Sequence, residues 1–224
     1  MAADIVPELL QTIQAMFREE MEYNPIIKRY QKMLEKGTAG FVQADRYAYE
    51  VGRTMSTCLS VGFAGAPLPD GRIYYNIADR IITPMLEEEF DVITDATKKI
   101  ITKMNRQAGL NLQAMQPDIN MDRIKGIVDA VSSQEELGAA LEYLQEPVEN
   151  FGVHTVDDTI RHNAKVQKGA GLRPKIVRTT NGRCCKWCEE LAGEYDYPVS
   201  TPEVYQRHEN CNCVIEFHPT RMRA

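Results

Sequence analysis

The side chains with the most reactive chemistry are concentrated near the C-terminal end of the sequence. Five of the six cysteines lie within residues 183–217, together with a histidine. They form two clusters, Cys185-x2-Cys188 and His208-x2-Cys211-x-Cys213. This spacing is typical of a zinc knuckle paired with a second half-site, because two thiolates flanking a turn and a distant pair can enclose a tetrahedral ion. The sequence therefore predicts a structural Zn²⁺ site.

The two clusters offer more candidate ligands than a tetrahedral site needs. Cys185 and Cys188 are the firm pair, since a Cys-x2-Cys turn places both thiolates on one ion with little strain. His208, Cys211 and Cys213 compete for the two remaining positions. Spacing alone does not choose among them, so all five residues stand as predicted metal ligands.

The other cysteines and the last histidine are predicted to lie outside this site. Cys184 adjoins Cys185 and points elsewhere in any regular turn. Cys58 is a lone thiol in an apolar helical pattern, which favours core packing. His218 stands in a His-Pro pair and is expected at the surface.

Disulfide bonds are the alternative use of these thiols. Disulfides suit small secreted domains, but the first residues show neither the basic region nor the apolar stretch of a secretion signal. A reducing compartment would leave the thiols free to bind a metal. Five cysteines also cannot all pair with one another. We therefore prefer a metal to disulfides.

The known enzymatic uses of such residues require other patterns. His208-Glu209 is followed by Asn-Cys, so the His-Glu-x-x-His helix of zinc proteases is absent. Zinc deaminases place their histidine before the Cys-x-x-Cys pair, which is the reverse of the order here. A redox dithiol would follow a βαβ pattern, and none precedes Cys185. We therefore expect no catalytic residues and no enzymatic activity, with a metal-dependent hydrolase or toxin as a less favoured alternative.

Aromatic residues near the clusters have two interpretations. Trp187, Tyr195, Tyr197 and Tyr205 could stack on bases, as in zinc knuckles that bind nucleic acid. They could instead form the small core around the metal, because so small a module needs aromatic area to bury. We favour the packing role and keep a nucleic-acid-binding zinc protein as the alternative function.

Charge is distributed unevenly along the chain, whose formal net charge is −6. Residues 1–150 carry 15 Lys and Arg against 23 Asp and Glu, whereas residues 151–224 carry 11 against 9. The acidic first part argues against general duplex-DNA binding, which needs concentrated positive charge. The acidic groups Glu87–Glu89 and Asp157-Asp158 are expected on solvated helix faces. No apolar run approaches the length of a membrane span.

The elements that must position the clusters are mostly helical. Apolar residues recur at helical spacing through most of the first 168 residues. The expected helices begin near residue 5 and cover 25–36, 41–63, 75–108, 122–131, 135–144 and 156–168. Pro84 is expected to divide or kink the fourth helix, and Pro147 to separate the last two.

Two strand candidates flank the clusters. Lys175–Thr179 and Cys213–Phe217 are short and β-rich, and they are predicted to pair. A two-stranded sheet alone is marginally stable, which is a reason for a metal beside it. The predicted fold is therefore mainly α, with a helical body over residues 1–150. Residues 151–224 are expected to hold a last helix, the two-stranded sheet and the zinc-stapled α+β module.

The C-terminal motif resembles that of a known group of viral proteins. Cys-x-Trp-Cys-x-x-Leu-Ala-Gly-x-Tyr, followed by Tyr-x-Arg-His-x-Asn-Cys-x-Cys, is similar to the end of tailed-bacteriophage minor head proteins of the Mu F-like head morphogenesis group. The matching residues are Cys185, Trp187, Cys188, Leu191, Ala192, Gly193, Tyr195, Tyr205, Arg207, His208, Asn210, Cys211 and Cys213. The resemblance also takes in residues 159–174 and, less specifically, 79–85. Where many members have His-Pro-x-Cys-Arg-Cys, this chain has His-Glu-Asn-Cys-Asn-Cys, which keeps the thiols.

The resemblance implies a minor capsid protein of a phage or prophage. Such a protein would lie in the virion, in the capsid interior or the portal region, after assembly in the host cytoplasm. Its expected partners are the portal protein and the major capsid protein, with packaged DNA and self-association as further contacts. Some members carry fused toxin or enzyme domains. This chain ends seven residues after Phe217, so we expect no such domain here.

Overall fold

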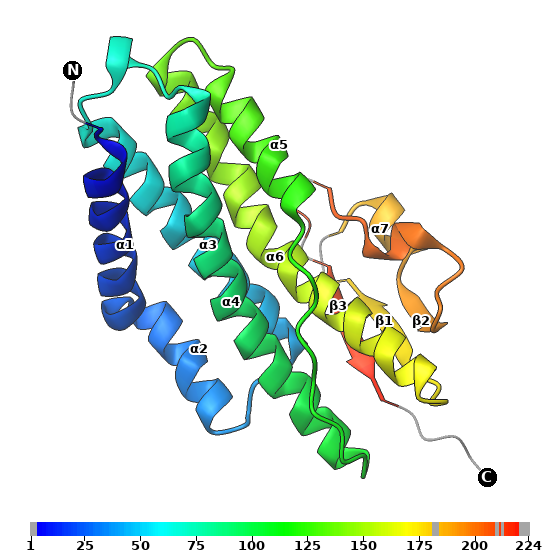
Figure 1. Cartoon of the computed structure of the whole chain (residues 1–224). Coiled ribbons are helices and arrows are strands. Elements are labelled where there is room, and N and C mark those ends of the chain that lie inside the picture. The colour runs from blue at the N-terminus through cyan, green and yellow to red at the C-terminus, as the bar shows by residue number, and fades with distance from the viewer. Residues whose placement is uncertain (1–3, 181–183, 209–210, 212, 220–224) are drawn as a thin grey trace. The chain divides into compact units, whose positions relative to one another are not determined.

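The computed structural model describes residues 4–180, 184–208, 211 and 213–219 (Figure 1). Helices account for most of them, and a small antiparallel sheet follows near the C-terminal end. The helices are α1 (Val6–Tyr23), α2 (Pro25–Glu35), α3 (Phe41–Gly65), α4 (Tyr75–Gln107), α5 (Met121–Ser132), α6 (Leu137–Gly169) and α7 (Lys186–Glu190). The strands are β1 (Lys175–Thr179), β2 (Gly193–Asp196) and β3 (Val214–His218). The expected mainly α fold is confirmed.

Apolar spacing located most helices well, whereas Pro147 misled the prediction. The expected helices at 25–36, 41–63 and 122–131 match α2, α3 and α5 within two residues. The predicted break at Pro147 is wrong, because α6 continues through it. Proline removes one backbone donor, but Leu144 and Val148 beside it are fully buried. Their packing therefore holds this turn helical.

The chain packs into two compact units, each assembled from separate stretches. The first contains Met1–Lys32, Arg46–Ile93 and Asp118–Thr155, and the second contains Met33–Asp45, Thr94–Pro117 and Val156–Ala224. Helices α2, α3, α4 and α6 each contribute residues to both units. The predicted boundary between two domains after residue 150 remains a prediction.

The first unit has an aliphatic and aromatic core supplied by one face of each of its helices. Residues with less than 2% exposed surface include Ile13, Phe17, Met55, Leu59, Ile81, Ile82 and Met85. On α1 they recur at a spacing of four, as an amphipathic helix requires. Burial of this apolar surface is the main stabilising contribution in the unit.

One carboxyl group is enclosed in the first unit. Glu89 of α4 is fully buried, and neither carboxyl oxygen has a hydrogen-bond partner among the described residues. Two glycines make room for it. A methyl group added at Gly52 would lie 3.1 Å from Glu89 Oε1, and one added at Gly152 would lie 2.6 Å from the same atom. Burial raises the pKa of Glu89 well above its usual value. The expectation of a solvated face at Glu87–Glu89 is therefore wrong for Glu89.

The sheet belongs to the second unit and has the strand order β2-β1-β3. The two predicted strands pair antiparallel, with Thr179 opposite Val214 and Lys175 opposite His218. The third strand, β2, was not predicted, because its residues are mostly exposed and show no apolar alternation. The buried faces of β1 and β3 contribute Ile176, Ile215 and Phe217 to the core of this unit.

A polar ladder holds the irregular segment between α4 and α5 in the second unit. Asn163 of α6 exchanges two hydrogen bonds of 2.8 Å with the backbone of Met115. Gln167 donates to Asn105 at 2.7 Å, and Asn105 donates to the Leu112 carbonyl at 3.1 Å. These amides are buried, so each bond also satisfies a group that would otherwise lose its water.

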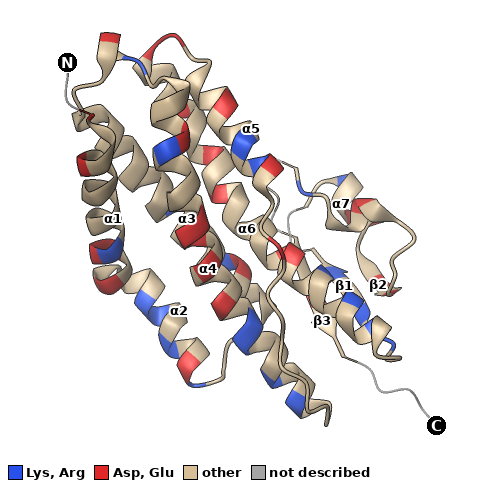
Figure 2. Cartoon of the chain, in the orientation of Figure 1, with Lys and Arg blue, Asp and Glu red and all other residues tan. Residues whose placement is uncertain are grey.

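Charge alternates in blocks along the helices (Figure 2). Figure 2 shows acidic residues in the middle of α4, with lysines and arginines toward its end. Helix α2 carries Lys28, Arg29 and Lys32 within three turns. The net negative charge of residues 1–150 is therefore interrupted by basic segments rather than spread evenly.

Candidate metal centre

The register of the sheet brings the two predicted ligand clusters together. Cys185 lies at the N-terminus of α7 and Cys188 lies within it, shortly after β1. Cys213 directly precedes β3. Because the end of β1 pairs with the start of β3, the segment with the first cluster begins beside the point of the sheet where the segment with the second cluster ends. Figure 1 shows α7 beside the three strands.

All five predicted ligands fall into two overlapping groups. The ligand atoms of Cys185, Cys188 and His208 lie within 4.8 Å of one another, as do those of Cys188, Cys211 and Cys213. His208 Nε2 is 3.3 Å from Cys185 Sγ and 3.0 Å from Cys188 Sγ. The sulfur atoms of Cys188 and Cys211 are 3.8 Å apart. Cys188 therefore links the two predicted clusters.

These separations fit a small tetrahedral site. Bonds of about 2.3 Å from a metal to two thiolates at the tetrahedral angle place the sulfurs about 3.8 Å apart. The Cys188–Cys211 separation has this value. The two distances from His208 Nε2 to the sulfurs are shorter than the nitrogen-to-sulfur separation in a tetrahedral zinc site, by roughly half an ångström or less. The cluster can therefore hold a metal ion.

The protein environment favours the thiolate at one cysteine in each cluster. The backbone N–H groups of Cys188 and Trp187, together with the Cys188 thiol and His208, lower the pKa of Cys185. Burial opposes ionisation of Cys211, but the N–H and thiol of Cys213 and other neighbours outweigh it and lower the pKa. Since the thiolate is the form that binds metal, these bonds prepare Cys185 and Cys211 for coordination.

The two remaining thiols favour the neutral form in the absence of a metal. Burial raises the pKa of Cys188 to about 12, despite the nearby Arg178. Burial also raises the pKa of Cys213, which is 2% exposed. Metal binding at Cys188 would therefore release a proton, as it does wherever a thiol becomes a ligand.

The residues predicted to lie outside the site belong to neither metal-binding group. Cys184 is directed at Glu189, with its sulfur 3.8 Å from a carboxylate oxygen. His218 lies 3.3 Å from Glu216 at the end of β3. Cys58 is buried in α3 of the first unit, as expected for core packing. All six cysteines are described, and none forms a disulfide bond.

A buried ion cluster, which sequence reasoning missed, anchors the second ligand segment. Arg207, adjacent to His208, donates to both carboxylate oxygens of Asp157 at 2.6 and 2.7 Å and to Asp45 at 3.0 Å. It also donates to the Cys213 carbonyl at 2.6 Å. Arg207 therefore ties the segment between His208 and β3 to residues of α3 and α6 in the same unit. The solvated position expected for Asp157 is wrong.

All three side chains of this cluster are removed from water. The side chains of Arg207, Asp45 and Asp157 are 6%, 10% and 4% exposed. Burial and the neighbouring Asp157 raise the pKa of Asp45 to about 7, while Arg207 acts in the opposite direction. Burial opposes the charge of Arg207, but Asp157 and Asp45 outweigh it and raise the pKa. The guanidinium group therefore stays charged, and Asp157 is its principal partner.

The aromatic residues of the motif are engaged in contacts within the module. The Trp187 and His208 rings form a T-shaped pair, with ring centroids 5.9 Å apart. Tyr195 donates a hydrogen bond of 2.9 Å to the Leu191 carbonyl. The guanidinium group of Arg161 lies over the Tyr205 ring, 5.5 Å from the ring centroid. These contacts support the interpretation that the rings form the small core around the ligands.

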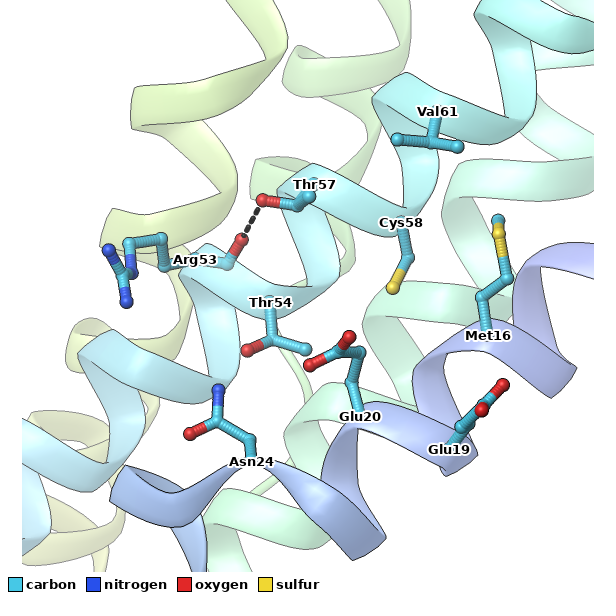
Figure 3. A pocket seen from close by; sticks show the side chains of 9 residues that line it. All are labelled: Met16, Glu19, Glu20, Asn24, Arg53, Thr54, Thr57, Cys58 and Val61. Carbon is cyan, nitrogen blue, oxygen red and sulfur yellow. Dashed lines mark hydrogen bonds between the residues drawn. The ribbon is translucent and has the colours of Figure 1, made fainter.

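A cavity of about 520 Å³ lies in the first unit and is lined mainly by residues of α1 and α3. Figure 3 shows Glu20 of α1 facing Thr54 and Cys58 of α3 across this space. Burial, with a smaller contribution from Glu20, raises the pKa of Cys58 to about 11. The thiol is therefore neither a ready nucleophile nor a ready ligand.

Among the described residues, no helix combines the length and apolar character needed to cross a bilayer. Comparisons with models of protein families, with curated proteins and with solved structures found no match for this chain. The interpretation of the site therefore depends on its own residues and geometry.

Proposed function

We propose that this chain is a structural protein of a tailed-phage head, and that one Zn²⁺ ion holds its C-terminal module together. The observation that carries the proposal is that the residues responsible for the family resemblance contact one another. Trp187 packs on His208, Tyr195 bonds to Leu191, and Arg207 bonds to Cys213. A motif whose members support one another around a Cys/His cluster has the character of a stapled structural module.

Zinc suits this cluster better than other common metals. Thiolates and imidazole in a tetrahedral arrangement favour Zn²⁺, whereas Mg²⁺ and Ca²⁺ prefer oxygen ligands. Five candidate ligands are sufficient to fill all four positions of the ion. A site closed by protein ligands is structural rather than catalytic, which favours the structural role over a hydrolase or toxin.

The proposed role of the ion is mechanical. The sheet has only three short strands, and β2 is largely exposed. A small module of this kind gains folding free energy directly from a bound metal. The ion would hold β1 and β3 as a rigid surface for a portal or capsid partner. The acidic first part of the chain, residues 1–150, would supply a second docking surface.

Nucleic-acid binding is the less favoured alternative. Base stacking needs an accessible aromatic face, and Trp187 is partly covered. Arg178 lies over this ring at 5.4 Å, and the His208 ring packs against it in a T-shaped arrangement. These contacts support the packing role, and they would have to be broken for a base to stack there.

The metal is tested by native mass spectrometry of protein purified without added metal. We expect one zinc per chain, lost when Cys185 and Cys188 are both changed to serine. Cys184→Ser is the matched control, because Cys184 precedes this pair but belongs to neither ligand group. A wild-type protein that carries no zinc and takes up none on addition would disprove the metal centre.

The assembly role is tested by sedimentation with heads and portal rings purified from the phage or prophage whose genome encodes the chain. We expect the zinc-loaded protein to sediment with one of them and the Cys185→Ser/Cys188→Ser variant to remain in the supernatant. Failure of the zinc-loaded protein to sediment with both would refute the head assignment and leave the metal centre untouched.

A further inference from the structure

The largest fully buried side chain in the described part of the protein is an arginine. Arg178 lies on β1 and is 1% exposed. Strand alternation directs it to the same buried face as Ile176, which is 0% exposed. Charged side chains are almost never fully buried unless a partner compensates them. The position of Arg178 therefore calls for a compensating group.

Arg178 contacts both segments that carry the candidate ligands. Its Nη1 donates hydrogen bonds of 2.7 Å to the carbonyls of Val204 and Gln206, which lead to His208. Its Nη2 lies 3.6 Å from Cys188 Sγ and 3.8 Å from Cys211 Sγ. One end of the guanidinium group therefore orients the backbone before the second cluster, and the other end reaches one sulfur of each cluster.

No carboxylate compensates this charge among the described residues. The other buried arginine of the module, Arg207, has Asp157 and Asp45 as ion-pair partners. Within the described ranges, the partners of Arg178 are carbonyls, the Trp187 ring and the two sulfurs. Removing an isolated charge from water costs on the order of several kcal/mol. Carbonyl dipoles offset only part of that cost. In the part of the chain that the structure describes, the remaining candidates for negative charge are the sulfur atoms.

We propose that Arg178 is the buried counter-ion of the metal centre, and that it holds Cys188 and Cys211 in the positions from which both bind the ion. This inference depends on the proposed metal centre. A divalent ion with three thiolates and one imidazole carries a net charge of −1, which one guanidinium group balances. N–H···S bonds to bound thiolates also fix their orientation, as groups around a metal site commonly do for its ligands. Arg178 is thus a positioning residue for the metal rather than a ligand.

The test measures metal binding by the full-length Arg178→Met protein. Methionine keeps much of the volume and apolar packing while removing the charge and both N–H···S bonds. We expect the affinity for Zn²⁺, measured by competition with a chromophoric chelator, to fall about 10- to 100-fold. Arg173→Met is the matched control, since Arg173 is an exposed arginine just before β1, and its affinity should equal that of the wild type.

Cobalt substitution separates a positioning role from a general loss of packing. Thiolates that lose a hydrogen bond from a cation become stronger donors, so the thiolate-to-Co²⁺ charge-transfer band of Arg178→Met should move to lower energy. The Arg173→Met band should not move. An Arg178→Met protein with wild-type affinity and a wild-type band would overturn the inference, whereas a wild-type chain that binds no metal would overturn the metal centre itself.

Arg178→Lys decides the question if the methionine variant fails to fold. Lysine keeps the positive charge, but its single ammonium group cannot reproduce the fork that reaches two sulfurs and two carbonyls. We expect this protein to fold, as judged by circular dichroism, and to show a shifted charge-transfer band with weaker binding. A band and an affinity identical to those of the wild type would overturn the two-sulfur contact.

Discussion

The buried carboxyl group of Glu89 should make the protein less stable as the pH rises, and Glu89→Met should remove that dependence. Both carboxyl oxygens lack hydrogen-bond partners among the described residues, and Gly52 and Gly152, which have no side chains, leave room for the group. Methionine is an unbranched apolar side chain of similar length, so it can occupy the same space without strain. The substitution therefore replaces an unsatisfied polar group with a packed apolar one.

The magnitude has a constant part and a part that grows with pH. An unsatisfied buried polar group costs about 1–3 kcal/mol, so Glu89→Met should be more stable by this amount even at low pH. Burial raises the folded-state pKa of Glu89 above its unfolded value, so the folded chain holds a proton that the unfolded chain releases. Unfolding is then favoured as pH rises above about 4.5, by roughly 1.4 kcal/mol per pH unit, until the folded-state pKa is reached.

The assay is urea unfolding of both proteins across a pH series, followed by circular dichroism. The free energy of unfolding of the wild type is subtracted from that of Glu89→Met at each pH, so that contributions common to both cancel. This difference should widen as the pH rises from 5 toward neutrality. Glu87→Met is the control, because Glu87 is exposed on the same helix, and its effect should stay within about 0.5 kcal/mol. Parallel stability curves for the wild type and Glu89→Met would refute the reasoning.

Two further substitutions test packing and the ion cluster. Gly152→Ala should destabilise by about 1–3 kcal/mol in urea unfolding, because its methyl group would meet the Ala48 carbonyl at 2.8 Å and Glu89 at 2.6 Å. Gly126→Ala, with open space around it in α5, should instead stabilise by up to about 1 kcal/mol. Arg207→Met should cost about 3–5 kcal/mol at neutral pH, since it leaves Asp157 buried without its partner. Arg161→Met removes a largely exposed pair with Asp158 and the contact of Arg161 with the Tyr205 ring, and should cost less, about 1–2 kcal/mol in the same measurement.

The parts of the fold that sequence predicted are those governed by local patterns. Apolar residues at a spacing of three and four located α2, α3 and α5, and β-rich alternation located β1 and β3. The ligand clusters were recognisable because Cys-x2-Cys and His-x2-Cys-x-Cys are local spacings with a known use. Strand β2 and the short helix α7 lacked such patterns, being short and largely exposed.

The residues that sequence reasoning missed are buried charges. Glu89, Asp157, Arg178 and Arg207 look like surface residues in a sequence, and charged residues are usually exposed. What buries each of them is a contact with a residue distant in the chain, such as the 50 residues that separate Arg207 from Asp157. Arg178 had one local signal, since strand alternation places it on the same face as Ile176. Only the register of the sheet shows that this face is buried.

The balance of buried charge narrows the choice of metal ligands that spacing left open. Arg207 is balanced by Asp157, and the raised pKa of Asp45 allows a proton to neutralise the second carboxyl group of that cluster. Among the residues that the structure describes, Arg178 then contributes one positive charge that no carboxylate compensates. A Zn²⁺ ion with three thiolates and His208 supplies one negative charge, whereas four thiolates would supply two and leave one unbalanced. Since an unbalanced buried charge is costly, the charges favour a centre that includes His208 and leaves one cysteine of the second cluster as a neutral thiol. Because Arg178 Nη2 lies 3.8 Å from the Cys211 sulfur, we expect Cys211 to be the second-cluster cysteine that joins the centre and Cys213 to be the one left out.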